Sequence, residues 1–195
     1  MKEGYIKYQC NLTNKILDYY PEMNWINTYR KELKLRNMLG VYSSGISYGN
    51  ISMRIGKVRF LITGTQTGAV EDLDSCHFSI VNEYDISKNI LNCTGELNAS
   101  SEALSHASIY NVLPNCNAVI HIHHLQLWRK LLNKVPTIGE SFEYGTPEIA
   151  AEIAKTIIND MDNSRGIIAL AGHYEGLISY GDTIAVASEE ILKYF

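Results

Sequence analysis

Short runs of β-branched and aromatic residues, broken by glycines, fill residues 41–66 and constrain the fold more than any other part of the sequence. The runs YSSGISYGNISMRI and VRFLITGT are typical of strands joined by tight turns. Two more pairs of short apolar runs flank polar or glycine-rich turns: FSIVNEYD with NILNC, and RGIIAL with GLISYG. Such hairpin patterns favour an antiparallel sheet over a doubly wound parallel one.

Helical patterns are expected before, between and after these strands. Residues 9–39 are predicted to be mainly helical, interrupted near Pro21 and ending at Gly40. Further helices are predicted in SSEALSHASIYNVL, LQLWRKLLNK, TPEIAAEIAKTIIND and DTIAVASEEILKYF, and a strand in NAVIHIH. The sequence therefore predicts a mixed α/β protein with one domain spanning residues 1–195.

Composition limits the function classes. The 195 residues are 46% hydrophobic and carry a net charge of −4, which suits a domain with a sizeable core and gives no reason to expect a nucleic acid or a membrane as partner. We find no segment of signal-peptide or membrane-spanning character, so a cytoplasmic protein is expected. Four scattered cysteines, Cys10, Cys76, Cys93 and Cys116, are then expected to be reduced and unpaired.

Three histidines lie at the end of the strand predicted in NAVIHIH. Side chains alternate along a strand, so His121 and His123 share one face and Ile122 points to the other. His124 is expected to face away or to begin the next helix. The shared face suits two imidazoles that bind one metal ion, but hydrogen-bonded histidines at a strand end have the same pattern.

Two other residues complete a possible ligand set. His173 lies in LAGHYEG, where small residues leave room for an imidazole to reach inward. Glu102 follows Ser100 and Ser101, one of which is expected to cap the helix, and a carboxylate there is favoured by the helix dipole whatever its function. With the two strand histidines they form a plausible set of three nitrogens and one carboxylate for a divalent cation.

Several short motifs follow one another along about residues 25–190. In chain order they are Gly49-Asn50-Ile51-Ser52-Met53-Arg54, Phe60-Leu61-Ile62-Thr63-Gly64, Ser100-Ser101-Glu102 with His106, His121-Ile122-His123, Gly145-Thr146-Pro147-Glu148 and Gly172-His173. Their order and separation resemble the class II aldolase/adducin family. The resemblance implies a three-layer α/β/α fold with a central, mainly antiparallel sheet flanked by helices. It also implies a homotetramer with active sites at subunit boundaries.

The resemblance also implies a site. His121, His123 and His173 would bind one Zn²⁺ per subunit, with another divalent metal possible, and Glu102 would ligate the resting metal and act as acid or base. Substrate phosphate would be held by Gly49, Asn50, Thr63, Gly64, Ser100 and Ser101. A glycine-rich turn, hydroxyls and a helix N-terminus can together bind an anion without net positive charge.

The implied activity is that of a zinc-dependent lyase of the aldolase type. It would cleave or form a C–C bond in a small phosphorylated ketose through a metal-stabilised enediolate. The alternative enzyme is a sugar-phosphate dehydratase or epimerase of the same family. An Asp at position 102 would favour the epimerases, whereas Glu102 favours an aldolase or a dehydratase. A non-catalytic adducin-like assembly module is the alternative outside enzymes. The presence of all four ligands favours the enzyme.

Some positions depart from the family pattern. Gly139 and Glu140 fall where fuculose-phosphate aldolases supply a catalytic tyrosine, and Ala99 replaces a usual proline. Tyr174 and Glu175 are the nearest other acid/base candidates, or else are surface turn residues.

Two further motif residues have more than one interpretation. His106 lies one helical turn from Glu102, and either supports the metal site or is purely structural. Arg54 is expected to form a structural ion pair rather than to touch substrate.

Overall fold

A nine-stranded sheet forms the centre of the computed structural model, which describes residues 5–159 and 164–195. Its strands are β1 (Gln9–Asn14), β4 (Asn50–Arg54), β5 (Phe60–Thr63), β6 (Phe78–Asp85), β7 (Ile90–Gly95), β8 (Ala118–His123), β9 (Thr137–Ile138), β10 (Gly166–Leu170) and β11 (Gly176–Gly181). The helices are α1 (Pro21–Leu35), α2 (Ala103–Val112), α3 (Leu125–Leu131), α4 (Pro147–Ile158) and α5 (Ile184–Leu192), with a short 3₁₀ turn at Ser75–His77. A separate pair, β2 (Gly40–Val41) and β3 (Ser47–Tyr48), forms a small hairpin.

The sheet is mainly antiparallel, as the hairpin patterns predicted. The strand order is β1-β7-β6-β5-β4-β8-β11-β10-β9. Only the two outermost pairs, β1 with β7 and β10 with β9, are parallel. The strand pairs expected around the polar turn at 86–89 and around the bend at 171–175 are confirmed.

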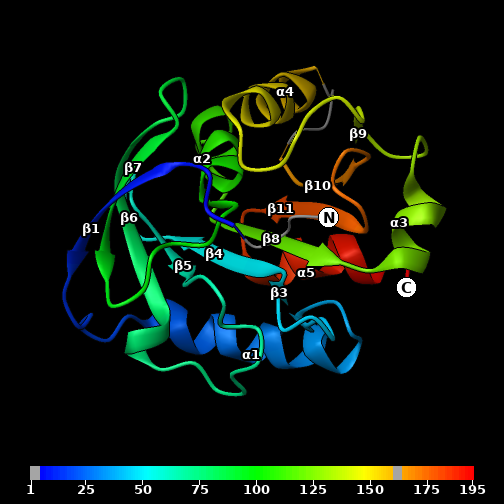
Figure 1. The fold of residues 1–195 in the computed structure, drawn as a ribbon. Helices are drawn as coiled ribbons and strands as arrows, with labels where there is room; N and C mark the ends of the chain where they lie inside the picture. The colour runs from blue at the N-terminus through cyan, green and yellow to red at the C-terminus, as the bar shows by residue number, and fades with distance from the viewer. Residues whose placement is uncertain (1–4, 160–163) are drawn as a thin grey trace.

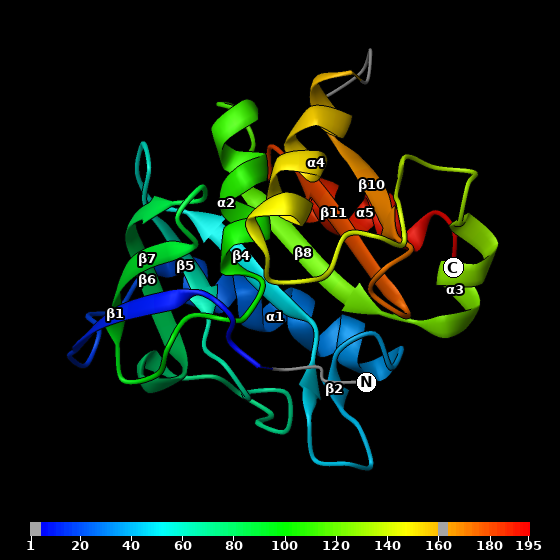
Figure 2. The same cartoon turned by 45° about the horizontal axis from the view of Figure 1, so that its top comes forward.

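Helices cover both faces of the sheet, so the three-layer architecture is confirmed. Helices α2 and α4 pack together on one face, and α1 and α5 lie on the other (Figures 1 and 2). Each face has its own apolar core, which we call the α2/α4 core and the α1/α5 core. Among the described residues, no helix has the length and apolar character needed to cross a membrane.

The prediction of helix over residues 9–39 is wrong at its start. Residues 9–14 form strand β1, which pairs with β7 at the edge of the sheet. Tyr8, Cys10 and Leu12 alternate with polar residues and turn toward the α2/α4 core, which is a strand period rather than a helical one. The helix begins at Pro21, because proline is well suited to the first helical position.

Strand β8 places its histidines on the face covered by α2 and α4. Ile120 and Ile122 pack into the α1/α5 core, whereas Val119 packs into the α2/α4 core. His121 and His123 alternate in phase with Val119, so they face the layer that contains the start of α2. Because of this alternation along β8, a further functional side chain near the histidines can come from α2 but not from α1 or α5.

Arg54 has a structural role, but it forms no ion pair with any described carboxylate, so the ion pair expected from the sequence is not found there. Its guanidinium donates hydrogen bonds to backbone carbonyls at the end of α2, before β8 and in the β4–β5 turn. These acceptors are the carbonyl oxygens of Cys116, Lys57, Tyr110 and Leu113.

We expect Arg54→Met to lower the free energy of unfolding by about 2–4 kcal/mol, because partly buried carbonyls lose charged donors. Urea unfolding measures the change. Arg59→Met removes an exposed arginine nearby and is the control, with an expected change within about 0.5 kcal/mol. Equal unfolding midpoints for the two variants would refute the role of Arg54.

Candidate active site

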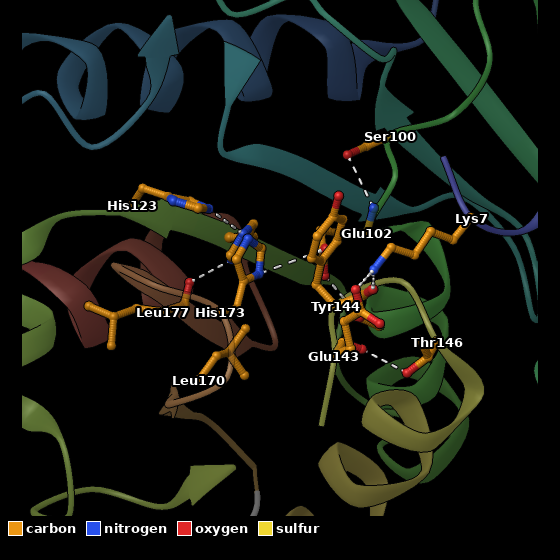
Figure 3. Close-up of polar contacts among 12 residues, drawn as sticks. Lys7, Ser100, Glu102, His123, Glu143, Tyr144, Thr146, Leu170, His173 and Leu177 are labelled. Atoms are coloured by element: carbon orange, nitrogen blue, oxygen red, sulfur yellow. Dashed lines mark hydrogen bonds and ion pairs between the residues drawn. The ribbon is translucent and has the colours of Figure 1, made fainter. Parts of the chain in front are cut away.

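Three histidines converge where β8 ends and the β10–β11 turn begins. His121 and His123 come from β8, and His173 comes from the turn. One ring nitrogen of each lies within 4.8 Å of those of the other two, and the side chains are buried, with relative exposures of 1%, 4% and 5%. Figure 3 shows His123 and His173 pointing toward one another. The structure thus brings together all three histidines singled out from the sequence.

A backbone carbonyl fixes the tautomer of His121. Its Nδ1 donates to the carbonyl oxygen of Leu177 at 3.0 Å, and a carbonyl can only accept. In the neutral ring, Nε2 therefore carries a lone pair. That Nε2 lies 3.0 Å from Nε2 of His123. Two nitrogens bound tetrahedrally to one zinc ion at 2.0–2.1 Å would lie about 3.3 Å apart, so the observed spacing is close to that of a ligand pair.

A tyrosine and a glutamate orient His123. The hydroxyl of Tyr42 lies 2.8 Å from Nδ1 of His123 and donates to Oε2 of Glu175 at 3.1 Å. Because the Tyr42 proton goes to the carboxylate, its oxygen accepts from Nδ1–H of His123. The Nε2 of His123 then carries a lone pair, which faces the lone pair on Nε2 of His121. Neither Tyr42 nor this use of Glu175 was predicted from the sequence.

Burial keeps these imidazoles neutral. It lowers the pKa of His121 to about 4, despite the hydrogen bond to Leu177, which acts in the opposite direction. Burial also lowers the pKa of His123 and of His173 well below the usual value, and the neighbouring histidines lower it further. Neutral imidazole is the form that binds metals.

Glu102 lies beside the triad, at the start of α2. Its Oε1 is 3.9 Å from Nδ1 of His173 (Figure 3). Its Oε2 accepts a hydrogen bond from the Ser105 hydroxyl at 3.0 Å. The side chain is 2% exposed. The oxygen that faces the histidines is therefore Oε1. Glu102 itself occupies the N-cap position of α2, so the expected cap at Ser100 or Ser101 is wrong.

Two glycines allow the backbone to approach the histidines. A Cβ on Gly176 would lie 3.2 Å from Cγ of His173 and 3.3 Å from Cε1 of His121. Gly49 has a φ of +75°, and a Cβ there would lie 2.1 Å from a side-chain carbon of Leu39 and 3.1 Å from the carbonyl oxygen of His121. Larger residues at these positions would displace the face of β8 that carries the histidines.

A pocket opens beside the triad, and most of the residues predicted to bind phosphate line it. Its wall includes Gly49, Asn50, Gly64, Ser100 and Ser101, together with Glu102 and the three histidines. Thr63 is outside the pocket, because its buried hydroxyl accepts from the backbone N–H of Ile51. The other lining residues are Ser47, Tyr48, Thr65, Gln66, Thr67 and Tyr144, of which residues 65–67 continue the turn that begins at Thr63 and Gly64.

Tyr144 closes one side of this pocket. Its ring stacks on His173, with centroids 4.9 Å apart and an angle of 25° between the planes. Nζ of Lys7, just before β1, lies 3.9 Å from the Tyr144 ring centre, contacts the Tyr144 carbonyl at 2.9 Å and pairs with Glu143 at 2.6 Å (Figure 3). Segments far apart in the sequence therefore meet at the pocket.

Other candidate residues lie outside the ligand set. The Nδ1 of His124 accepts from the backbone N–H of Leu127 and caps α3. His106 is fully buried and bonds through Nδ1 to Ser52 at 2.7 Å. Tyr174 packs against Trp128, with ring centroids 5.3 Å apart. His124 thus begins the next helix, which was one of the two positions expected for it, and the Nδ1 of His106 contacts Ser52 rather than one of the three clustered histidines.

Comparisons with protein families and with known proteins show what the chain is similar to. The family model described as the class II aldolase and adducin N-terminal domain matches residues 42–193. No match was found among curated proteins.

Solved structures share the fold. An L-fuculose 1-phosphate aldolase has 19% identity and a TM-score of 0.66, and the match covers 92% of this chain and 84% of that one. YgbL from Escherichia coli has 19% identity and a TM-score of 0.64, and the match covers 88% of this chain and 84% of that one. A sugar-phosphate aldolase from Thermotoga maritima has 16% identity and a TM-score of 0.65, and the match covers 88% of this chain and 89% of that one. Because the family model covers most of the sequence, the chain belongs to the class II aldolase and adducin family.

Proposed function

We propose that this protein is a metal-dependent lyase of the aldolase type that acts on a small phosphorylated ketose. Family membership, together with the sugar-phosphate aldolases among the similar structures, supports an enzyme of the class II aldolase type. Membership of the family also favours a homotetramer in the cytoplasm, which sedimentation and cell fractionation test.

The observation that carries the proposal is the pair of Nε2 atoms of His121 and His123. Their hydrogen bonds leave two lone pairs facing each other at 3.0 Å in a buried place, with His173 beside them. Such lone pairs repel unless a cation or a proton lies between them. Three neutral imidazoles with a carboxylate alongside fit Zn²⁺, one per chain, and other divalent transition metals fit the same donors.

The pocket wall is suited to the phosphate. Ser100 and Ser101 precede the ten-residue helix α2, whose N-terminus favours anions. Asn50 is 7% exposed, and its carboxamide oxygen has no hydrogen-bond partner among the described residues. A buried amide of this kind is satisfied when a polar ligand binds in the pocket. Gly49 and Gly64 contribute backbone close to the same space.

Glu102 is the proposed acid/base. A cation bound at the three histidines supplies Lewis-acid chemistry toward adjacent carbonyl and hydroxyl oxygens of the substrate. Ser105 holds Oε2, so Oε1 of Glu102 is the atom that takes up or returns a proton. The stacked ring of Tyr144 and the buried walls exclude water from this side of His173.

Tyr42 and Glu175 are expected to set metal affinity through His123. Tyr42→Phe removes the oxygen that accepts from Nδ1 of His123, and we expect zinc affinity to fall about 10–100-fold. Competition with a chelator of known affinity measures the change. Tyr48→Phe is the matched control, because that ring also packs against His123 while the Tyr42 hydroxyl remains. Equal affinities for the two variants would refute the orienting role.

A substrate panel tests the proposed reaction. Zinc-loaded protein is incubated with ketose 1-phosphates, ketose 5-phosphates and methylthioribulose 1-phosphate, and the products are separated. Aldehyde and ketone fragments from a ketose phosphate support the aldolase. Loss of water or interconversion of isomers identifies the dehydratase or epimerase instead, and YgbL, described with aldolase, epimerase and decarboxylase as alternatives, makes the panel necessary. Absence of turnover with bound metal contradicts the proposal.

A further inference from the structure

Two cysteines are in contact at the edge of the sheet formed by β1. The Sγ atoms of Cys10 and Cys93 lie 3.1 Å apart. In the parallel register Cys10 is opposite Leu91 and Cys93 is opposite Leu12, so the two cysteines lie two positions apart on one face. Cys93 is buried and Cys10 is partly exposed, so solvent reaches the pair from one side. The sequence, in which they are 83 positions apart, gave no sign of this contact.

The pair also contacts the segment that leads into the pocket. The backbone N–H of Ala99 lies near both sulfurs and acts to lower the pKa of each thiol. A proline at position 99 would have no N–H to donate. On the same segment, the hydroxyl of Tyr8 lies 2.6 Å from the carbonyl oxygen of Ala99 and 3.2 Å from that of Ser100. Side chains of β1 and its preceding residue therefore hold residues 99–100.

We propose that Cys10 and Cys93 form a reversible oxidation site, and that their disulfide changes the conformation of residues 99–102 at the pocket. The oxidant is a peroxide. One S–S bond forms while two S–H bonds and the O–O bond of hydrogen peroxide break, and the peroxide is reduced to two water molecules. The thiols supply both electrons and both protons, so no further reactant is needed.

The arrangement suits this chemistry. At 3.1 Å, the S–H of one cysteine can donate to the thiolate of the other, and such a hydrogen bond from Cys10 lowers the pKa of Cys93. A thiolate is the reactive form of cysteine. Whichever sulfur the peroxide oxidises first, the other lies 3.1 Å away and can displace the oxygen as water.

The disulfide would reach the pocket through Ala99. Bonded sulfurs lie about 2.05 Å apart, so the two must approach by about 1 Å. Tyr8, two residues before Cys10, donates to the carbonyl oxygens of Ala99 and Ser100, so movement of β1 toward Cys93 shifts the chain before Glu102. Lys7, three residues before Cys10, contacts Tyr144 and carries the change to the opposite wall.

Peroxide treatment of the reduced full chain tests the site. We expect thiols titrated under denaturing conditions to fall from four to two per chain, with a mass loss of about 2 Da and one peptide pair joining positions 10 and 93. Dithiothreitol restores all four. Cys116→Ser still loses two thiols, whereas Cys10→Ser forms no intramolecular disulfide. Retention of four thiols, or a bond that involves Cys76 or Cys116, would overturn the proposal.

Amide hydrogen exchange tests the coupling to the pocket, and this readout needs neither metal nor substrate. A peptide covering residues 97–104 should exchange at a rate that differs at least about threefold between the reduced and the disulfide forms. In Cys10→Ser, peroxide should leave the rate unchanged. Equal rates in the reduced and disulfide forms of the natural sequence would refute the coupling.

Discussion

Replacing His121 and His123 together by alanine is expected to reduce bound zinc from about one ion per chain to below about 0.1 and to abolish turnover. The two rings supply two of the three nitrogens that lie within 4.8 Å of one another. His173 and Glu102 would remain, but two ligands do not hold zinc against a competing chelator. Metal content after dialysis, measured by mass spectrometry, gives the result.

The neighbouring histidine provides the control for this experiment. His124 caps α3 through Leu127 and points away from the triad, so His124→Ala should keep its zinc at a modest cost in stability. Circular dichroism confirms that each variant is folded. Full zinc content in the folded double variant would show that the metal is bound elsewhere. Among the described residues, Asp74, Cys76 and His77 form the other cluster of possible ligands.

Glu102→Gln is expected to lower turnover by a factor of about 10²–10⁴, because the amide cannot exchange the proton assigned to Oε1. The amide keeps the shape of the side chain and can still accept from Ser105, so the pocket should remain intact. Zinc affinity should fall far less than turnover, since the three histidines stay in place. Steady-state kinetics on the active substrate, alongside zinc titration, separates the two effects.

A second glutamate serves as the matched control. Glu148 is exposed in the first turn of α4, and Glu148→Gln should leave kcat and KM unchanged. If Glu102→Gln kept turnover within about threefold of the natural sequence, Glu102 would not be the acid/base and another group would have to move the proton.

Local sequence patterns predicted the centre of the fold better than its edge. The alternation in AVIHIH correctly placed His121 and His123 on one face, because a strand buried on both sides leaves no other arrangement. Strand β1 was not predicted, because only Cys10 and Leu12 of its six residues turn inward and the alternation of apolar and polar residues is therefore weak. Its partner β7 also lies some 80 residues away along the chain. Long-range pairing of this kind has no local signal.

The site residues that belong to short sequence motifs could be predicted, whereas those that only the folded chain brings to the site could not. The histidines and Glu102 stood in recognisable order along the chain. Tyr42, by contrast, reaches His123 only because a loop after β2 folds over the end of β8, and Tyr144 meets His173 from the segment before α4. Thr63 matched a motif, yet its strand position turns the hydroxyl toward Ile51.

X-ray absorption at the zinc edge of the zinc-loaded full chain shows directly which atoms bind the metal. We expect one zinc per chain with three imidazole nitrogens at about 2.0–2.1 Å, an oxygen ligand and no sulfur. A sulfur ligand at about 2.3 Å would place the metal at Cys76 or another cysteine instead. Fewer than two imidazoles around the zinc would likewise contradict a metal centre built from His121, His123 and His173.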